Sequence, residues 1–466
     1  MQPPASLWWS TLDEPVSARA SLRAEIDVDV AIVGGGFTGL WSARELLRRD
    51  PSLRVAILER EVCGFGASGR NGGWASALYP VSDPVVRRHF GDESADDLRV
   101  ALEEAVVDLG TALQEDGIDA HYRRGGTFVG ARNEAQATRL KKSVQDARLL
   151  GVTCEDLSWL DPEEARERVA MSSLLGATFS PHCARIHPAR LVRGLSDVVE
   201  ALGATIYENT PVTRILPATR RQRATLVTPF SQVSAQYVIR ATEGYTPTLA
   251  GERRTLVPLY SLMIATEPLE ESFFAEIGLR HYETFADDRN LIIYGQRTED
   301  NRLAFGGRGA PYHFGSVVEP RFDANDRVFA LLESTLHELF PTFDARVTHR
   351  WGGALAMPRD LSPFVQVDHE SGLCAAGGYT GDGVVLSRVA ASALADLITA
   401  PDEETSFTRL PFVQHRAKRW EAEPLRWMGI SAGLALATLA DRTEKRTGRE
   451  SRAGGMLDRL FDQFPP

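Results

Sequence analysis

The chain has 466 residues, too many for one hydrophobic core, so two domains are expected. Its 52 Lys and Arg residues against 63 Asp and Glu residues give a formal net charge of -11. This balance argues against nucleic acid as a partner, because neutralising phosphates requires a basic surface. The four cysteines lie far apart and form no CxxC pair. They argue against structural zinc and a dense disulfide framework, and favour a reducing compartment.

Neither a signal peptide nor a membrane-spanning helix is expected. Residues 1–13 lack the charged region and the following apolar run of a signal peptide. The longest apolar stretch, Trp427–Leu439, is shorter than the roughly 20 residues that cross a bilayer. We interpret it as a packed helix, with contact to a membrane interface as the alternative. The sequence predicts a cytoplasmic protein.

The first predicted elements form a β–α–β unit. Val28–Val33 is almost continuously apolar, which is typical of a parallel strand buried on both faces. Leu40–Arg49 has apolar residues at helical spacing on one face, and Pro51 blocks its continuation. Arg54–Leu58 is predicted as the second strand, with a right-handed connection.

The rest of the chain mixes helices and strands. Helical segments with a short strand near 126–129 are expected between 84 and 150, then a helix at 189–203 and strands at 205–207 and 237–240. Strands at 259–266, 290–294 and 302–306 predict an antiparallel sheet, followed by a helix at 327–339. A strand–turn–helix is predicted at 373–398. The last sixty residues are predicted to be mostly helical, with the charged segment 441–452 as a solvated tail.

A dinucleotide-binding fingerprint lies at the first strand–helix junction. Gly34, Gly36 and Gly39 stand in GxGxxG register, and Glu59 follows 20 residues after Gly39, at the end of the second strand. This is the context that the fingerprint requires. Gly34 permits the tight turn, Gly36 admits the pyrophosphate, and Gly39 lets the helix pack closely on the strand. We expect the phosphates at the helix N-terminus and the adenosine ribose at Glu59.

Two further glycine-rich loops favour FAD over NAD. The first, Gly64–Gly73, comes shortly after Glu59, and the second, Gly377–Val384, lies between a predicted strand and a predicted helix. Loops that expose their backbone suit a ligand that extends beyond the adenine half and carries an isoalloxazine. A second strand–GxGxxG–helix unit is missing, so a separate NAD domain is not expected.

At these residues the sequence resembles the D-amino-acid oxidase superfamily of flavoproteins. It is most similar to the bacterial branch that includes gamma-glutamylputrescine oxidase, glycine oxidase and sarcosine oxidase. The matching pieces run in the family's order from about Asp27 to Ile398. They are VAIVGGGFTGL, LEREVCGFGASGRNGG, ARIHPARLVRGL, the TPV at 210–212, ATEGY, WGGALAMPRDLSPF and GGYTGDGV.

The resemblance implies an α/β fold with a Rossmann-like, discontinuous FAD-binding domain. It assigns residues 1–83, 160–250 and 350–400 to this domain. Residues 84–159 and 251–349 are expected to form an inserted substrate-binding domain with a mixed or antiparallel β-sheet. Residues 401–466 are expected to form a C-terminal helical extension.

The resemblance also implies which residues bind FAD. The predicted ADP site consists of Gly34, Gly36, Phe37, Thr38, Gly39, Glu59 and Arg60, with Val212 at the adenine. Ser68, Asn71, Gly72 and Gly73 are expected beside the flavin and the pyrophosphate. Gly378, Tyr379, Gly381, Asp382, Gly383 and Val384 are expected at the pyrimidine side of the flavin and the ribityl chain.

Three departures from the family's pattern bear on the chemistry. Some relatives attach flavin through a histidine near the first loop or a cysteine in the C-terminal part; Arg70–Asn71 and Met357–Pro363 hold neither, which predicts non-covalent FAD. The sarcosine-oxidase branch uses a lysine near the flavin for reaction with oxygen. Arg302–Gly306 lacks one, so the acceptor is left as oxygen or another compound. Many relatives carry histidine where Asp382 stands, which could alter the flavin's electronics.

We therefore expect an FAD-dependent enzyme that oxidises the C–N bond of a small amine or amino acid. Hydride transfer to flavin N5 would give an imine, and because the amine must be neutral, activity should rise toward alkaline pH. An amino-acid substrate calls for an arginine that clamps its carboxylate. Candidates for this clamp are Arg297, Arg302 and Arg308, with a surface role as the alternative. Tyr260 and Tyr379 are candidates for lining the pocket and Trp74 for covering the flavin ring, each with packing as the alternative, and Asp382 is a further catalytic candidate.

Other functions remain open or are set aside. The same scaffold hosts hydroxy-acid oxidation, and the chain could be a flavin subunit with a protein partner on its C-terminal helices, 423–440. The GxSxG match at 429–433 lacks the downstream histidine that a hydrolase triad needs. His182, Cys183 and His187 lack further ligands at suitable spacing, so no metal site is expected, and His187 is predicted at a helix entrance.

Overall fold

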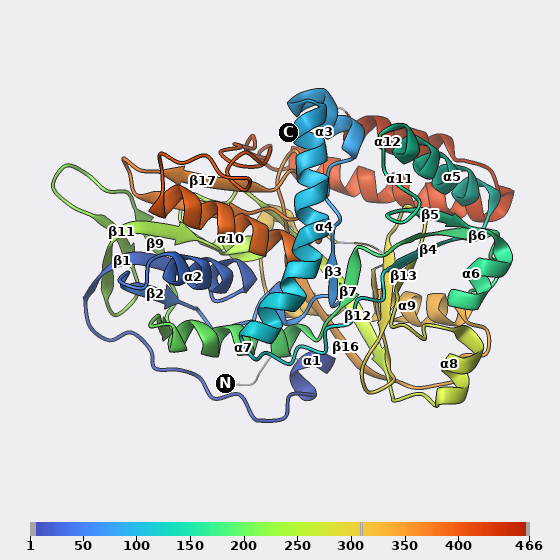
Figure 1. Ribbon diagram of the computed structural model, residues 1–466, viewed down its shortest axis with the longest axis horizontal. Coiled ribbons are helices and arrows are strands. Elements are labelled where there is room, and N and C mark those ends of the chain that lie inside the picture. The colour runs from blue at the N-terminus through green and yellow to red at the C-terminus, as the bar shows by residue number, and fades with distance from the viewer. Residues whose placement is uncertain (1–5, 308, 310, 463–466) are drawn as a thin grey trace.

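Two β-sheets lie side by side and define the architecture (Figure 1). The computed structural model describes residues 6–307, 309 and 311–462, with side chains through residue 457. Among the described helices, none combines the length and the apolarity that crossing a membrane requires.

The first sheet is centred on β1 (Ile26–Val33), which is buried on both faces as predicted. Val30 and Ile32 pack into one core, and Ala31 and Val33 pack into another. All strands run parallel to β1 except β17 at one edge and β10, which pairs antiparallel with both β11 and β9. In addition to β1 the sheet contains β2 (Val55–Leu58), β8 (Thr205–Tyr207), β9 (Arg214–Leu216), β10 (Ala224–Val227), β11 (Gln232–Arg240), β17 (Phe364–Asp368) and β18 (Leu373–Gly377).

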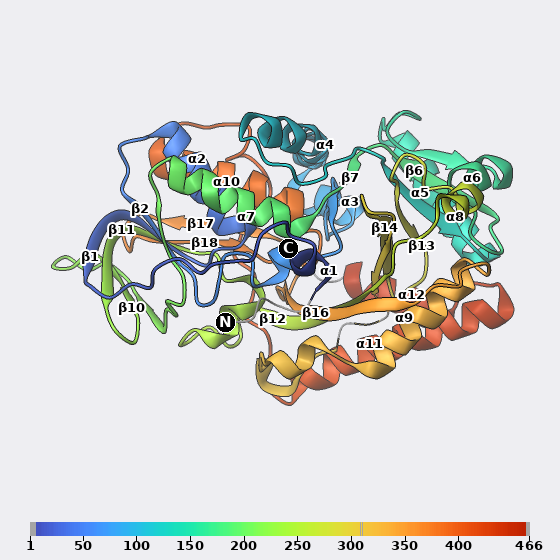
Figure 2. The same cartoon turned by 90° about the horizontal axis from the view of Figure 1, so that it is seen from below.

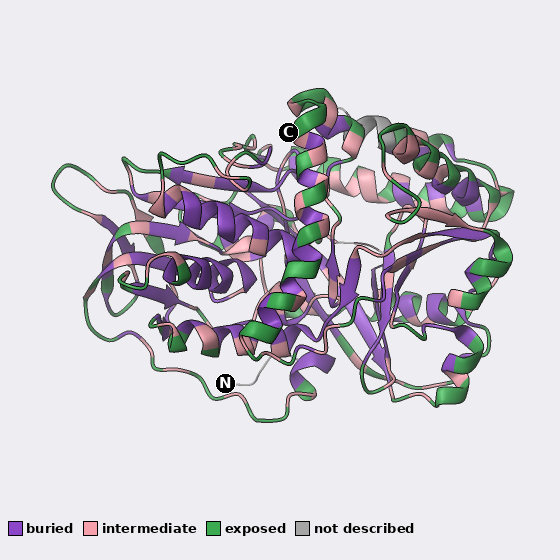
Figure 3. Ribbon diagram, in the orientation of Figure 1, coloured by how far each residue is buried: buried purple, intermediate pink, exposed green. Residues whose placement is uncertain are grey.

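Helices cover one face of the first sheet, as Figure 2 shows. They are α2 (Phe37–Arg49), α4 (Asp92–Glu115), α7 (Pro188–Ala201) and α10 (Gly383–Thr399), and α3 (Asp83–Phe90) precedes α4. α10 packs against both α2 and α4 and is buried along almost its whole length (Figure 3). An apolar surface all round the helix suits this central position.

The second sheet is mixed, with one parallel pair, β4 and β13, among antiparallel neighbours. Its order is β16 (Val347–Met357), β12 (Val257–Thr266), β15 (Leu303–Gly307), β14 (Ile293–Arg297), β13 (Thr284–Asp287), β4 (Thr127–Ala131), β6 (Gly176–Ser180) and β5 (Ser158–Leu160). Leu332 and Leu336 of α9 (Asp326–Leu339) share a core with Leu262 and Phe305 of the sheet. At its outer end lie α5 (Glu134–Leu149), α6 (Pro162–Arg168) and α8 (Glu271–Ile277).

Two segments pair differently from the partition that the sequence suggested. We expected residues 160–180 and 350–357 in the FAD-binding domain, whereas β6 pairs with β4, and β16 pairs with β12 as far as Met357. These pairings are long-range, and no local pattern in either segment specifies which sheet it joins. A short ribbon of β3 (Trp74–Ser76) and β7 (Cys183–Arg185) lies between the two sheets.

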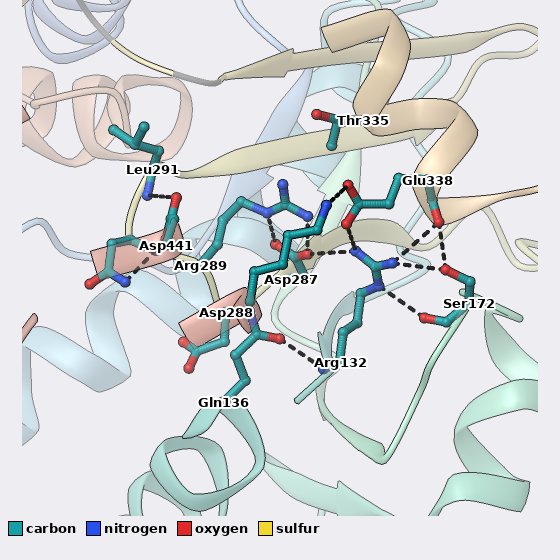
Figure 4. A network of polar contacts seen from close by, with 12 residues as sticks. Arg132, Gln136, Ser172, Asp287, Asp288, Arg289, Leu291, Thr335, Glu338 and Asp441 are labelled. Atoms are coloured by element: carbon teal, nitrogen blue, oxygen red, sulfur yellow. Dashed lines mark hydrogen bonds and ion pairs between the residues drawn. The ribbon is translucent and has the colours of Figure 1, made fainter. Parts of the chain in front are cut away.

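The C-terminal part contains two helices, α11 (Leu425–Thr447) and α12 (Arg452–Asp462), after the largely irregular segment 400–424. The prediction of a solvated tail at 441–452 is wrong, because residues 441–447 form the last turns of α11 and are anchored. Asp441 accepts hydrogen bonds from the backbone N–H groups of Asn290 (2.7 Å) and Leu291 (3.1 Å), next to β13 (Figure 4). Glu444 is buried and pairs with Arg139 of α5 at 2.9 Å.

A charged network continues from this anchor into the second sheet. Arg132 pairs with Glu338 (3.0 Å) and Asp287 (3.5 Å), and Arg289 pairs with Asp287 (Figure 4). Lys445 of α11 also reaches Glu338, at 2.7 Å. Asp441, Glu444 and Lys445 of the predicted tail therefore find partners on the turn after β13, α5 and α9, none of which is near in sequence.

Replacing Asp441 by alanine should destabilise this part of the protein, because two backbone N–H groups lose their acceptor. We expect a loss of about 1–3 kcal/mol in the free energy of unfolding. Urea titration monitored by circular dichroism measures it, with Arg442→Ala, on the exposed next residue, as the control. Equal stability of the two variants would show that the anchor contributes nothing.

Candidate functional site

The fingerprint turn has the geometry that its three glycines require. Gly34 has a φ of +111°, and a Cβ there would lie 2.5 Å from the carbonyl oxygen of Ala241 at the end of the neighbouring β11. A Cβ on Gly39 would lie 2.0 Å from the carbonyl oxygen of Gly34. Gly36 is the N-cap of α2 and offers no side chain to cap it. The N-terminus of α2 is thus open to a ligand at the carboxyl edge of the sheet, where anions bind readily.

A hydrogen bond between residues 341 positions apart joins the fingerprint turn to the second glycine-rich loop. The hydroxyl groups of Thr38 in α2 and Tyr379 before α10 lie 3.1 Å apart, and both residues are buried. Ser68 accepts a hydrogen bond from the N–H of Phe37 at 2.9 Å, which brings the first loop to the same point. Three loops that the sequence singled out separately therefore meet at the N-terminus of α2.

Glu59 lies at the end of β2 and faces the fingerprint turn. Its carboxylate accepts hydrogen bonds from the N–H groups of Gly35 (2.7 Å) and Glu61 (2.9 Å). Burial raises its pKa to about 7. Thr210 donates its N–H to the carbonyl oxygen of Glu59 at 2.8 Å, and the half-buried Val212 follows two residues later. Neighbouring Arg60 is exposed.

The loop 64–73 is held by two tryptophans that the sequence did not single out. The indole N–H of Trp351 donates to the carbonyl oxygen of Arg70, and that of Trp8 donates to the carbonyl oxygen of Asn71, both at 2.8 Å. Trp8 lies in α1 (Leu7–Ser10). The Arg70 guanidinium is buried and pairs with Asp323 at 2.7 Å. The loop is therefore rigid, as a surface that receives a planar ring needs to be.

Within this loop the side chain of Asn71 folds the backbone. Its amide NH2 donates to the carbonyl oxygens of Ala67 and Ser68, and its oxygen accepts the N–H of Gly73 at 2.8 Å. Gly73 has a φ of +71°. Asn71 thus shapes the Gly72–Gly73 turn.

Glu243 holds the second glycine-rich loop in place. This carboxylate accepts the N–H of Gly378 at 2.7 Å, and burial raises its pKa to about 7. Gly378 and Gly381 have φ values of +78° and +108°, which explains why glycine stands there. Asp382 begins α10 without capping it, and burial raises its pKa to about 7 as well. Gly383 and the buried Val384 form the first turn of α10.

The second sheet supplies a polar wall opposite the first loop. The ring of Tyr294 lies against Gly72, where a Cβ would approach it to 2.5 Å, and its hydroxyl lies 2.6 Å from that of Ser261. Gln296, on the same face of β14, donates to the carbonyl oxygen of Gly72 at 2.7 Å. Its own Oε1 is buried and has no hydrogen-bond partner in the described structure. A buried acceptor without a partner is a group that a bound ligand would satisfy.

Sequence reasoning missed Tyr294, Ser261 and Gln296. The only local signal is that Tyr294 and Gln296 alternate along one strand, which any half-buried strand shows. Trp74, which we expected near the ring, lies beside this wall. It packs edge-on against Tyr294 at 6.2 Å and donates to the carbonyl oxygen of Gly295 at 3.2 Å.

The arginines proposed as carboxylate clamps are engaged elsewhere. Arg297 pairs with Glu271 at 2.9 Å and lies over the ring of Phe274. Arg302 pairs with Asp300 at 2.7 Å. Arg308 lies outside the described residues. Tyr260 is buried, and its hydroxyl accepts the N–H of Glu319 at 3.3 Å.

His187, Cys183 and the GxSxG match are the remaining features that the sequence singled out, and their contacts are those of structural residues. His187 is the N-cap of α7, as predicted, because its Nδ1 accepts the N–H of Arg190; burial lowers its pKa to about 3. Cys183 contacts the hydroxyl of Thr284 at 3.3 Å. The GxSxG match lies within α11, so Ser431 is not on a strand–helix elbow.

Comparison with known proteins decides which family this architecture represents. A family model described as DAO, FAD-dependent oxidoreductase, matches residues 29–397, from β1 to the end of α10. The chain belongs to this family. The resemblance to the D-amino-acid oxidase superfamily and the predicted Rossmann-like α/β fold are confirmed, and FAD is the cofactor. The match ends before α11.

Individual relatives of this FAD-dependent oxidoreductase cover most of the chain. Gamma-glutamylputrescine oxidoreductase of Escherichia coli (strain K12) is 31% identical over 419 residues, which cover 88% of this chain and 93% of that protein. Glycine oxidase of Geobacillus kaustophilus (strain HTA426) is 27% identical over 390 residues, covering 82% and 96%. The crystal structure of glycine oxidase from Geobacillus kaustophilus aligns with a TM-score of 0.71 at 24% identity, covering 84% of this chain and 100% of that one.

Replacing Gly39 by alanine should abolish FAD retention, because the new methyl group overlaps the carbonyl oxygen of Gly34. Absorbance of the purified protein at about 450 nm measures bound flavin. Gly433→Ala is the matched control, since a Cβ at that helical glycine meets nothing within 4 Å. Normal flavin content in Gly39→Ala would contradict the predicted role of this turn.

FAD affinity should rise with pH through the pKa of Glu59. If ribose hydroxyls donate to the ionised carboxylate, protonation competes with binding. With a raised pKa of about 7, the affinity of the apoprotein should increase from about pH 6 and level off near about pH 8. Quenching of FAD fluorescence measures it. Glu59→Gln should bind more weakly and lose this rise, and an unchanged pH dependence in that variant would exclude Glu59 as its source.

Proposed function

We propose that this FAD-dependent oxidoreductase oxidises the C–N bond of a small amine. The observation that carries the proposal is the wall of Tyr294, Ser261 and Gln296, which faces Gly72 of the first loop; Gln296 is buried and the other two are half-buried. A substrate enclosed between this wall and the flavin meets hydroxyl and amide groups. The similarity to gamma-glutamylputrescine oxidoreductase of Escherichia coli supports an amine substrate.

The proposed FAD site follows the three loops that meet at α2. Glu59, with Arg60 and Val212 nearby, holds the adenosine half, and the open N-terminus of α2 holds the pyrophosphate. The flavin lies along the other two loops, without a covalent link, since neither loop offers a histidine or a cysteine. The residues assigned to FAD are Gly34, Gly36, Phe37, Thr38, Gly39, Glu59, Arg60, Ser68, Asn71, Gly72, Gly73, Val212, Gly378, Tyr379, Gly381, Asp382, Gly383 and Val384.

The side chains of the wall orient the substrate and leave the redox chemistry to FAD. When bound, FAD would accept a hydride from the substrate C–H bond next to nitrogen; the neutral amine would thereby become an iminium ion, which water hydrolyses to a carbonyl compound and an ammonium ion. The paired hydroxyl groups of Ser261 and Tyr294 present a donor and an acceptor to the substrate nitrogen. Burial raises the pKa of Tyr294, so its hydroxyl stays protonated and serves as a neutral hydrogen-bond partner.

Two observations refine the class of substrate and its compartment. Arg297 pairs with Glu271 of α8, and Arg302 pairs with Asp300 of the turn between β14 and β15, so neither is available for an α-carboxylate. Of the candidate arginines that the structure describes, none is thus left as a carboxylate clamp, which favours an amine over an α-amino acid. The cysteines Cys63, Cys154, Cys183 and Cys374 are all free, in keeping with a reducing, cytoplasmic setting.

Anaerobic reduction of the bound flavin tests the proposal. We expect one or more primary or secondary amines to bleach the absorbance at about 450 nm, faster at alkaline pH because the neutral amine reacts. Tyr294→Phe should slow the reduction about tenfold through the loss of one hydrogen bond. Tyr237→Phe, whose hydroxyl contacts His369 on the first sheet, is the control.

Other outcomes point to other functions. Reduction by hydroxy acids alone would replace the proposal with C–O oxidation on the same scaffold. Reduction by none of the amines, amino acids or hydroxy acids in a broad panel would favour a flavin subunit that needs a protein partner. Admitting air after reduction shows whether oxygen accepts the electrons.

A further inference from the structure

Helix α11 presents an apolar face to solvent. Leu425, Trp427, Met428 and Leu439 are 65%, 42%, 56% and 53% exposed. Together with Ala432 and Ala435, also exposed, Leu425, Met428 and Leu439 recur every three or four residues and so line one side of the helix. The buried residues of α11, Arg426, Ala437, Ala440 and Glu444, lie on the opposite side. Figure 2 shows α11 along the outer edge of the molecule, beyond the second sheet.

The inner side of α11 is fixed at both ends, so the helix cannot roll to hide its apolar face. At its start Glu423 accepts hydrogen bonds from the N–H of Gly315 (2.8 Å) and the N–H of Trp427 (3.0 Å). At its end Asp441 and Glu444 are anchored to Asn290 and Arg139. The exposure of the apolar face is therefore built into the fold.

Positive charge flanks the apolar face. Residues 416–452 contain nine Lys and Arg residues and five Asp and Glu residues, in a chain whose net charge is -11. Arg442 and Arg446 are exposed and continue the spacing of Leu439 along the same side of α11. Lys418 and Arg419 are exposed just before the helix. None of these four has an ion-pair partner within the described part of the chain.

We infer that α11 docks this protein onto an anionic lipid surface. The helix lies flat, with Leu425, Met428 and Leu439 among the acyl chains and the flanking cations at the phosphates. Its 23 residues span about 35 Å along the surface. A second copy of the chain fits less well, since pairing two α11 faces would bring two positively charged regions together. This docking goes beyond the proposed oxidation and does not depend on it.

Co-sedimentation of the full-length holoprotein with vesicles tests the inference. We expect binding to vesicles of phosphatidylcholine with 30% phosphatidylglycerol, and at least about tenfold weaker binding to phosphatidylcholine alone or at about 0.5 M salt. Met428→Glu should weaken binding to the anionic vesicles at least about tenfold, as should the double variant Arg442→Glu/Arg446→Glu. Phe230→Glu is the matched control, because it places the same charge at a residue 69% exposed in the β10–β11 turn of the first sheet.

The outcomes separate the possible occupants of this face. Flavin content and melting temperature equal to those of the wild type establish that each variant is folded. No sedimentation with anionic vesicles, or equal sedimentation of Met428→Glu and the wild type, overturns the inference. A wild-type dimer in solution that Met428→Glu converts to a monomer overturns it in favour of a contact between copies. Loss of binding confined to the α11 variants supports it.

Discussion

The approach of α2 to the end of β1 is the constraint on which the rest of the structure depends. Gly39 and Gly34 touch backbone to backbone, and Gly34 also touches Ala241 at the end of β11. Because no side chain separates the helix from the sheet, the N–H groups of the first turn of α2 lie at the carboxyl edge of the parallel strands. A phosphate bound there is close to Glu59 on one side and to Ser68 on the other.

Everything else that contacts the proposed FAD site is positioned relative to this turn. The buried Thr38–Tyr379 contact connects α2 to α10, and the packing of these two helices sets the distance between the outer loops. Trp8 and Trp351 hold the first loop from the N-terminal segment and from the second sheet. The second sheet thereby places Tyr294 against Gly72 of the loop, and the proposed substrate site depends on this contact.

The C-terminal helices are also held by contacts between residues that are far apart in the sequence. At the end of α11 the charged residues Asp441, Glu444 and Lys445 bind Asn290, Arg139 and Glu338 on the inner side of the helix. The apolar residues of the helix therefore face outward. In most surface helices the apolar residues face the core and the charged residues face solvent. This arrangement lies outside residues 29–397, which the family model matches.

The sequence by itself determined the features that depend on local backbone geometry. The GxGxxG turn and the flanking strand and helix follow from residue types at fixed spacing, because a side chain on Gly34 or Gly39 would overlap the backbone. Only the tertiary structure decided which segments meet across long loops. It placed β6 and β16 in the second sheet, turned Tyr294 toward Gly72, and buried Glu444. Such pairings depend on the complementarity of distant surfaces, which no local periodicity encodes.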